Sequence, residues 1–422
     1  MKEKVFFKTF GCRTNIYDTE LLKRYVKDFE ITNDEKEAQI VVVNSCTVTN
    51  GADSGIKSYI NTMKKQGIKV ILTGCGAVSK GKELLEQKQI FGVLGASNKD
   101  KINEFLNAKT SFYELGNLNF IDKDIVCEYE NHTKAFVKIQ EGCDFACSYC
   151  IIPSVRGKSR SVVEKDLLKQ VEILAQNGYS EIVLTGTNIG SYGIKNGTTL
   201  GKLLQKMGKI SGIKRIRLGS LEPAQIDESF LEILDEAWIE KHLHIALQHT
   251  SEKMLRIMRR RSHTDNDLKL FNHIASKGFA LGTDFIVGHP GENESIWKEA
   301  LDHFKNFPLT HIHAFIFSPR NNTHSATMKE DLVSGDVAKE RLNLLKDIVE
   351  KNNYEFRKKN KVSLEILVET QKDGVFEGYD QFFNKIKIKS DQDIAKEWLL
   401  INRYEVQEKY NFSNFARLKN EK

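Results

Sequence analysis

Three cysteines spaced four and three residues apart mark a segment of this chain that could hold a metal cluster. Cys143, Cys147 and Cys150 lie in the short sequence EGCDFACSYC. Three thiolates on one loop can bind three irons of a [4Fe-4S] cluster and leave the fourth iron open to another ligand. Gly142 and Pro153 leave little room for a stable helix, which disfavours cysteines that merely fill one helix face. Zinc with a fourth ligand from elsewhere stays an alternative.

A second group of cysteines emerges from the pattern of the N-terminal region, where apolar, β-prone runs alternate with helical patterns. The expected strands are 5–10, 40–43 and 69–73, and the expected helices are 17–29, 52–65, 81–87 and 101–107. This alternation predicts an α/β domain with a doubly wound parallel sheet. Cys12, Cys46 and Cys75 each follow one of the strands. Because parallel strands end at the same sheet edge, we expect these thiols to meet there and hold a second cluster.

The composition is that of an ordinary globular protein with two or three domains. Of 422 residues, 40% are apolar and 28% are charged. No apolar run reaches the roughly 18–20 residues that span a bilayer, and no signal peptide is evident, so we expect a cytoplasmic protein without a membrane partner. Seven cysteines in such a chain favour thiolate ligands over disulfides. The net charge of +6 permits a nucleic-acid partner without requiring one.

The central region repeats a strand-and-helix pattern six times. The expected strands are 135–139, 181–184, 215–218, 243–247, 281–287 and 311–317. Six such units predict a partial parallel (βα)6 barrel, whose site residues would lie at the carboxyl ends of its strands. His242, His244, His311 and His313 alternate along two of these strands. With no acidic ligand expected nearby, we interpret them as core or rim histidines and not as metal ligands.

The cysteine loop, with the aromatic Tyr149 before its last cysteine, resembles the cluster loop of the radical S-adenosylmethionine (SAM) superfamily. In that family SAM chelates the open iron, and one electron from the cluster cleaves SAM to give a 5′-deoxyadenosyl radical. The resemblance implies that Tyr149 lies beside the SAM adenine. It also implies that the turn Gly186, Thr187 and Asn188 meets the SAM amino group.

Four further SAM contacts follow from the same resemblance. Glu222, with Ser220, is expected at the ribose hydroxyls, and Gln248 and Asp284 complete the match. The run RIMRRR is expected in a helix, on which three successive arginines cannot share one face. At least one must point toward the barrel mouth, and we assign Arg260 to the SAM carboxylate because a bidentate pair is natural there.

The contexts GCRTNIYDTE, VVVNSCTVTNGAD and LTGCGA resemble the N-terminal domain of the methylthiotransferases, which holds an auxiliary [4Fe-4S] cluster on three cysteines. The match spans roughly the first three quarters of the chain. The family converts a C–H bond to C–S–CH3: one SAM methylates sulfur at the auxiliary cluster, and a second supplies the radical. The resemblance therefore makes both cysteine groups catalytic as well as metal-binding. Cys127 lies at no ligand spacing and is interpreted as a bystander.

The expected domains are residues 1–120 with the auxiliary cluster, the barrel at 130–358, and a small all-β domain at 361–422. Expected strands of the last domain are 364–368, 375–378, 384–388, 398–401 and 404–406. By position it resembles the RNA-binding TRAM domain. Its eleven basic and eleven acidic residues give no electrostatic support for RNA binding. The aromatic residues that could stack on bases or fill its core are Phe382, Phe383, Tyr404, Tyr410 and Phe412.

Within the family, the sequences around the cysteines and the RIMRRR run most resemble the branch that acts on threonylcarbamoyladenosine in tRNA. The isopentenyl-adenosine branch and the branch that modifies an aspartate of a ribosomal protein are the alternatives. The resemblance implies a tRNA substrate and a low-potential electron donor such as flavodoxin or ferredoxin. The alternative outside the enzymes is an RNA-binding protein whose cysteines hold a structural metal ion. Structural metal sites, however, normally have four protein ligands.

Overall fold

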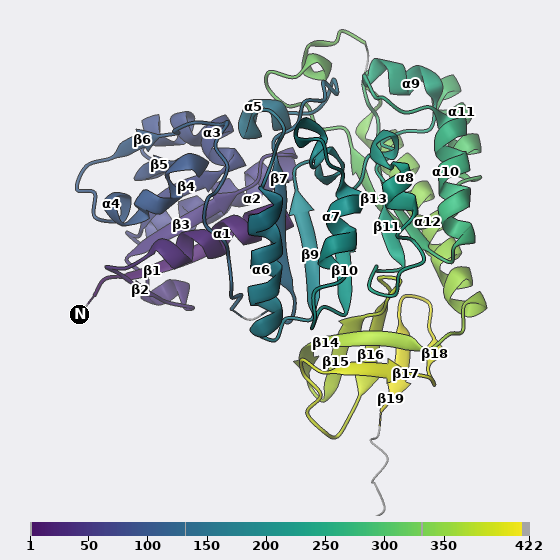
Figure 1. The fold of residues 1–422 in the computed structure, drawn as a ribbon. Coiled ribbons are helices and arrows are strands. Elements are labelled where there is room, and N and C mark those ends of the chain that lie inside the picture. Colours follow the sequence, from purple (N-terminus) through teal and green to yellow (C-terminus); the bar gives the residue numbers. More distant parts are fainter. Residues whose placement is uncertain (1, 131, 331, 416–422) are drawn as a thin grey trace, which may run out of the picture.

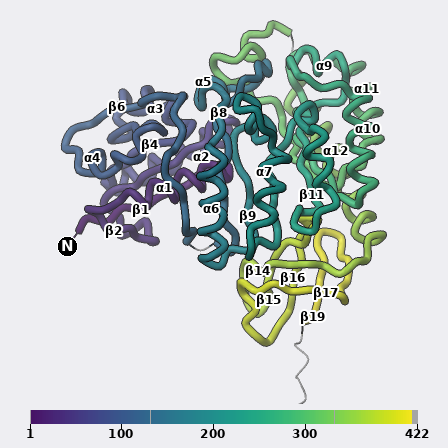
Figure 2. The backbone as a smooth tube through the Cα atoms, viewed as in Figure 1, coloured from purple at the N-terminus to yellow at the C-terminus, as the bar shows by residue number. Residues whose placement is uncertain are grey.

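The computed structural model describes residues 2–130, 132–330 and 332–415 (Figure 1), so the end of the expected C-terminal domain, 416–422, lies outside the described residues. An N-terminal sheet lies beside a parallel barrel, and a C-terminal sheet covers one end of that barrel (Figures 1 and 2). The expected mixed α/β architecture is confirmed. Within the described ranges, no helix is long and apolar enough to cross a membrane.

The N-terminal sheet is parallel throughout, with strand order β2-β1-β3-β4-β5-β6. Its strands are β1 (Lys4–Thr9), β2 (Glu30–Ile31), β3 (Ile40–Ser45), β4 (Lys69–Gly74), β5 (Gly92–Leu94) and β6 (Phe112–Glu114), and its helices are α1 (Arg13–Tyr25), α2 (Asn50–Lys65), α3 (Cys75–Glu86) and α4 (Ile102–Leu106). Every residue of β3 is buried, because separate apolar clusters cover the two faces of the sheet. Helices α1 and α3 begin several residues before the expected positions.

The six expected barrel strands are all present and form two parallel groups, joined by the bridges Ile216 to Ile239 and Leu221 to Ile245. The strands are β7 (Ala135–Glu141), β9 (Glu181–Gly186), β10 (Arg215–Leu218), β11 (His242–His244), β12 (Ala280–Val287) and β13 (Leu309–Ile316), with the short antiparallel β8 (Arg160–Ser161) beside β7. The helices are α5 (Ile152–Arg156), α6 (Glu164–Gln176), α7 (Leu200–Met207), α8 (Glu228–Leu231), α9 (Glu252–Ile257), α10 (Thr264–Ser276), α11 (Glu294–Phe304) and α12 (Gly335–Lys359).

The C-terminal sheet has the order β17-β14-β15-β16-β19-β18. Its strands are β14 (Leu364–Lys372), β15 (Val375–Tyr379), β16 (Lys385–Lys389), β17 (Trp398–Ile401), β18 (Glu405–Val406) and β19 (Asn411–Asn414), the last of which the sequence pattern missed. Phe383 stacks between Tyr379 and His242, at 4.7 and 5.2 Å between ring centroids. The buried Arg217 donates a hydrogen bond to the Asp380 carbonyl oxygen at 2.9 Å. These contacts fix the sheet to the amino-terminal end of the barrel.

Candidate functional site

The loop Cys143 to Cys150 follows strand β7 and lines a cavity of about 370 Å³ at the carboxyl end of the barrel. All three thiols of this loop face that cavity, together with Tyr149. Val48 and Thr49, which follow Cys46 after strand β3, also line the cavity. One space therefore lies between the cysteine loop and the region of the second cysteine group.

The cysteine loop is suited to binding iron. Burial raises the pKa of Cys147, and it raises the pKa of Cys150 to about 12, so both side chains are neutral thiols without metal. Iron would replace these protons, as it does in thiolate sites generally. The cavity wall also holds two buried polar atoms, Asn188 Oδ1 and Arg260 Nε, that have no hydrogen-bond partner among the described residues. Orphan polar atoms beside three thiols fit a cavity that receives a cluster with a polar ligand.

The structure brings most expected SAM residues to this cavity. Those that line it are Tyr149, Thr187, Asn188, Ser220, Glu222, Gln248, Arg260 and Asp284. Asn188 Nδ2 lies 3.5 Å from Cys143 Sγ, and Thr187 Oγ1 accepts a hydrogen bond from the Gly142 amide at 3.2 Å. Gly186 ends β9 and does not line the cavity; an added Cβ there would lie 2.7 Å from a neighbouring carbonyl oxygen. It holds the turn close to β7.

Arg260 reaches the cavity from a turn, and the expectation that RIMRRR is helical here is wrong. Helix α9 ends at Ile257, and Arg259 adopts a φ of 55°, which turns the chain. The Arg260 guanidinium donates hydrogen bonds to Glu222 Oε1 at 2.9 Å and to the Ala246 carbonyl at 2.6 Å, and its Nη2 forms an ion pair with Glu222 Oε2 at 2.5 Å. Its Nη1 also lies 3.8 Å from Cys147 Sγ. Glu222, expected at the SAM ribose, and Arg260, expected at the SAM carboxylate, are thus paired with each other.

The three N-terminal cysteines lie where parallel topology brings adjacent strands to one edge. Cys12, Cys46 and Cys75 follow β1, β3 and β4, which are neighbours in the sheet. Cys46 and Cys75 are buried, and burial raises the pKa of both thiols, that of Cys75 to about 11. Gly11 packs directly on this group, since a Cβ built there would lie 2.5 Å from Cys46 Cβ. Three thiols at one sheet edge, with Cys12 exposed and a glycine packed against Cys46, fit an inorganic cluster.

Arg156 joins the two cysteine groups, and sequence patterns gave no indication of this. Its Nε donates to Cys75 Sγ at 3.0 Å, while Nη1 contacts Asp18 Oδ2 at 2.8 Å and Glu141 Oε1 at 2.6 Å. Arg156 ends helix α5, which begins two residues after Cys150. One helical turn therefore carries the chain from the loop cysteines to the N-terminal cysteines.

A network of buried charges surrounds Arg156, and the partly buried Arg160 also contacts it, at 3.7 Å between its Nη2 and Glu141 Oε2. Three carboxylates, Asp18, Asp122 and Glu141, face three cations, Lys99, Lys138 and Arg156, with every side chain at most 5% exposed. Although burial opposes it, the cations hold the pKa of Asp18 well below its usual range and that of Glu141 at about 2. The network spans α1, β7 and α5, so it fixes the N-terminal sheet against the barrel.

Arg320 is a second residue that sequence reasoning missed. It lines both the main cavity and a neighbouring cavity of about 280 Å³ that Cys46 also lines. Its Nη1 donates to the Thr47 carbonyl at 2.9 Å and to Asp53 Oδ2 at 2.7 Å. The only signal was its position shortly after the last barrel strand, where site residues gather.

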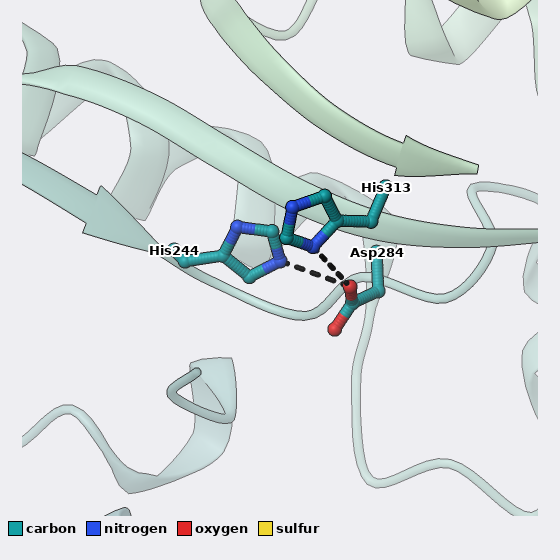
Figure 3. A group of neighbouring side chains, drawn as sticks. All are labelled: His244, Asp284 and His313. Atoms are coloured by element: carbon teal, nitrogen blue, oxygen red, sulfur yellow. Dashed lines mark ion pairs between the residues drawn. The ribbon is translucent and has the colours of Figure 1, made fainter. Parts of the chain in front are cut away.

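Two of the four barrel histidines have an acidic neighbour, contrary to expectation. Asp284 Oδ1 lies 3.0 Å from His244 Nε2 and 3.3 Å from His313 Nδ1, as Figure 3 shows. Sequence patterns missed this neighbour because it comes from a third strand, β12, between β11 and β13. His242 and His311 instead lie together at the barrel floor near Phe383.

Comparison with known proteins identifies the family. Residues 137–304 match the radical SAM superfamily, and residues 4–95 match the uncharacterized protein family UPF0004. A Helicobacter pylori (strain J99) protein, named as a methylthiotransferase without a substrate, is 51% identical over 98% of this chain and 100% of its own length. The threonylcarbamoyladenosine tRNA methylthiotransferase MtaB of Aquifex aeolicus is 35% identical over 85% of this chain and 90% of its own. The tRNA-2-methylthio-N(6)-dimethylallyladenosine synthase of Fervidobacterium nodosum is 32% identical over 89% and 90%.

Among solved structures, the radical SAM methyltransferase TsrM from Kitasatospora setae has the same fold. It superposes with a TM-score of 0.60 at 15% identity, over 77% of each chain. Such a distant match concerns fold alone. The sequence relatives, together with the loop of three cysteines on a barrel of this fold, carry the assignment further. The chain belongs to the radical-SAM methylthiotransferases, enzymes of a superfamily that uses a [4Fe-4S] cluster and SAM.

Proposed function

We propose that this enzyme is a tRNA methylthiotransferase that places a methylthio group on carbon two of threonylcarbamoyladenosine next to the anticodon. The observation that supports it best is the junction at α5, which joins two three-cysteine groups. One group lines the main cavity, and Cys46 of the other lines the neighbouring cavity. The reaction needs two such groups, because one must generate the radical while the other holds the sulfur to be transferred. Relatives named for the threonylcarbamoyl and dimethylallyl substrates both match this chain, and the cysteine contexts favour the former.

The six cysteines are proposed to hold two [4Fe-4S] clusters, with Cys143, Cys147 and Cys150 at the SAM site and the N-terminal three at the auxiliary site. When bound, the first cluster would supply the electron that cleaves SAM. Around it, Asn188 and the backbone turn beside Gly186 would hold the SAM amino group. Tyr149 would pack on the adenine. Gln248 and Asp284 stay in the proposed set of SAM contacts, Asp284 through Oδ2, since its Oδ1 faces His244 and His313.

Arg260 and Glu222 would bind SAM as a unit. The pair is bidentate, and Arg260 keeps one buried donor, Nε, without a partner in the described part of the chain. A SAM carboxylate could accept from this guanidinium, while Glu222 keeps an acceptor at the ribose. Because Glu222 balances the positive charge of Arg260, the buried guanidinium already has a counter-ion before SAM binds.

The C-terminal sheet is proposed to bind RNA, with the domain extending over residues 361–422. Lys385, Lys387 and Lys389 point to the outer face of β16, and Phe412 is the partner of Lys387 on β19. Lys387 also lies over the Tyr410 ring at 4.5 Å. Lysines interleaved with aromatic rings suit a single-stranded RNA segment. Phe382, by contrast, is buried in the core of the sheet.

Mass spectrometry of nucleosides from total tRNA tests the proposed function. In a strain lacking this gene, we expect methylthio-threonylcarbamoyladenosine to disappear and its unthiolated precursor to accumulate. Expression of the wild-type chain should restore it, and the Cys147→Ala variant should not. Loss of the methylthio-isopentenyl nucleoside would move the enzyme to that branch. An unchanged tRNA profile would contradict a tRNA substrate and direct attention to the ribosomal-protein aspartate.

Gly11→Ala tests the auxiliary site without touching a ligand. Gly11 has a φ of 101°, and an added Cβ would lie 2.5 Å from Cys46 Cβ and 3.1 Å from its Sγ. We expect iron content after anaerobic reconstitution to fall from about eight to about four per chain. Gly55→Ala is the matched control, since no atom of the described residues beyond its own neighbours lies within 4 Å of its added Cβ. Full iron content in Gly11→Ala would contradict a cluster at Cys46.

A further inference from the structure

His244, Asp284 and His313 form a compact group on three adjacent barrel strands. Asp284 and His313 are paired across β12 and β13, and His244 ends β11 on the other side of β12. Their ligand atoms all lie within 4.8 Å of one another, and their rings and carboxylate converge in Figure 3. The two imidazole rings are stacked at 4.7 Å between centroids, so both present a nitrogen to the same carboxylate oxygen.

The spacing of these atoms matches that around a single metal ion. Asp284 Oδ1 lies 3.0 Å from His244 Nε2 and 3.3 Å from His313 Nδ1. Nitrogen and oxygen ligands at about 2.0–2.1 Å from a tetrahedral ion lie about 3.3 Å from each other. Two of the three separations are therefore close to those around an ion, and the third, between the two ring nitrogens, is within 4.8 Å.

The buried ring nitrogen of His244 also supports a bound ion. Its side chain is 9% exposed, and its buried Nε2 makes no hydrogen bond within the described ranges, although Asp284 Oδ1 is only 3.0 Å away. The ring nitrogen is therefore near the carboxylate without being aligned to it. A buried ring nitrogen whose contact with a carboxylate is poorly directed is stabilised by a better aligned partner. A cation between the three groups would be that partner.

We propose that His244, Asp284 and His313 bind a divalent transition-metal ion beside the SAM cavity. Two imidazoles and one carboxylate on one side of an ion leave its other coordination positions open. Asp284 also lines the main cavity, and the His313 side chain is 65% exposed, so the open side is accessible to a substrate. Water or oxygen atoms of a substrate could fill these open positions.

The ligand class that fits is the carboxylate of the modified base, an assignment that rests on the proposed function. A threonylcarbamoyl group ends in a carboxylate beside a hydroxyl, and both are oxygen donors. An isopentenyl group has no oxygen donor. A metal ion on the cavity wall would therefore favour the threonylcarbamoyl substrate and leave an isopentenyl substrate without this contact.

Titration of the anaerobic holoenzyme with Mn²⁺, followed by the EPR signal of free Mn²⁺, tests the site. Mn²⁺ suits imidazole and carboxylate ligands and competes poorly for thiolates. We expect one bound equivalent in the wild-type chain and at least tenfold weaker binding in His313→Ala and Asp284→Asn. His313 is exposed and Asp284→Asn is an isosteric change, so both variants should fold, which circular dichroism checks. The exposed His324, changed to alanine, is the control.

The EPR spectrum of the bound Mn²⁺ also shows whether the modified nucleoside binds to the ion. Adding threonylcarbamoyladenosine nucleoside should broaden its EPR spectrum, and isopentenyl-adenosine should not. Absence of stoichiometric binding, or equal binding in His313→Ala, would overturn the metal site. Binding without any response to threonylcarbamoyladenosine would overturn the assigned ligand. These results are independent of the tRNA profile of the deletion strain, which tests the proposed function itself.

Discussion

Cys147→Ala should abolish SAM cleavage, whereas Cys75→Ala should keep SAM cleavage and lose methylthiolation. Cys147 faces the main cavity beside Arg260, so its loss removes one ligand of the SAM-binding cluster. Cys75 lies across α5, next to Arg156. We expect each affected reaction to fall at least a thousandfold, which corresponds to about 4 kcal/mol of transition-state stabilisation.

Two products measured in one assay separate these outcomes. Chromatography of 5′-deoxyadenosine follows SAM cleavage in dithionite-reduced protein, and nucleoside mass spectrometry follows methylthiolation of added tRNA. Cys127→Ala is the matched control, because Cys127 belongs to neither cysteine group, and both products should form at the wild-type rate. Full methylthiolation by Cys75→Ala would refute the second cluster.

Arg156→Met should lower stability by about 3–5 kcal/mol, the effect of leaving buried charges without their partner. Asp18 and Glu141 would each lose a hydrogen bond of 2.8 Å or less to a buried cation. Apparent melting should fall by roughly 6–10 °C, measured by anaerobic differential scanning fluorimetry. The auxiliary cluster should also be lost first on warming, because Cys75 loses its hydrogen bond.

A compensating variant distinguishes charge imbalance from lost packing. Asp18→Asn combined with Arg156→Met removes one charge of each sign, so the pair should be less harmful than the sum of the two single variants. Arg259→Met serves as control, since Arg259 is exposed and should leave melting unchanged. Additive losses in the double variant would show that the network is not coupled as the contacts suggest.

Sequence patterns predicted the elements and the cysteine positions because both are local. Cys12, Cys46 and Cys75 could be placed at one edge, since strand ends can be recognised in sequence and parallel topology brings them together. The same reasoning found the six barrel strands. It missed the short strands β2, β5 and β6 of the N-terminal sheet and β8 beside the barrel. It also missed β19, Asn411–Asn414, whose polar residues resemble a loop and which is held by parallel pairing with β16.

Pairings between distant residues could not be predicted. Arg156 and Asp18 are 138 positions apart, and nothing around either residue signals the other. Arg260 was expected to point toward the barrel mouth, and it does, but through a left-handed turn at Arg259 and not from a helix face. Its bond to Glu222 depends on how two strand ends face each other across the cavity, which no local pattern encodes.

The attachment of the C-terminal sheet beneath the barrel has a consequence for how a nucleotide is chosen. Phe383 and the Asp380 carbonyl hold the sheet at the end of the barrel opposite the cavity (Figure 1). If the outer face of this sheet binds RNA as proposed, it sets a fixed span between the bound segment and the reactive space. The enzyme would then select its nucleotide by measuring along the RNA, and lengthening the anticodon stem by a few base pairs would carry the target base out of reach.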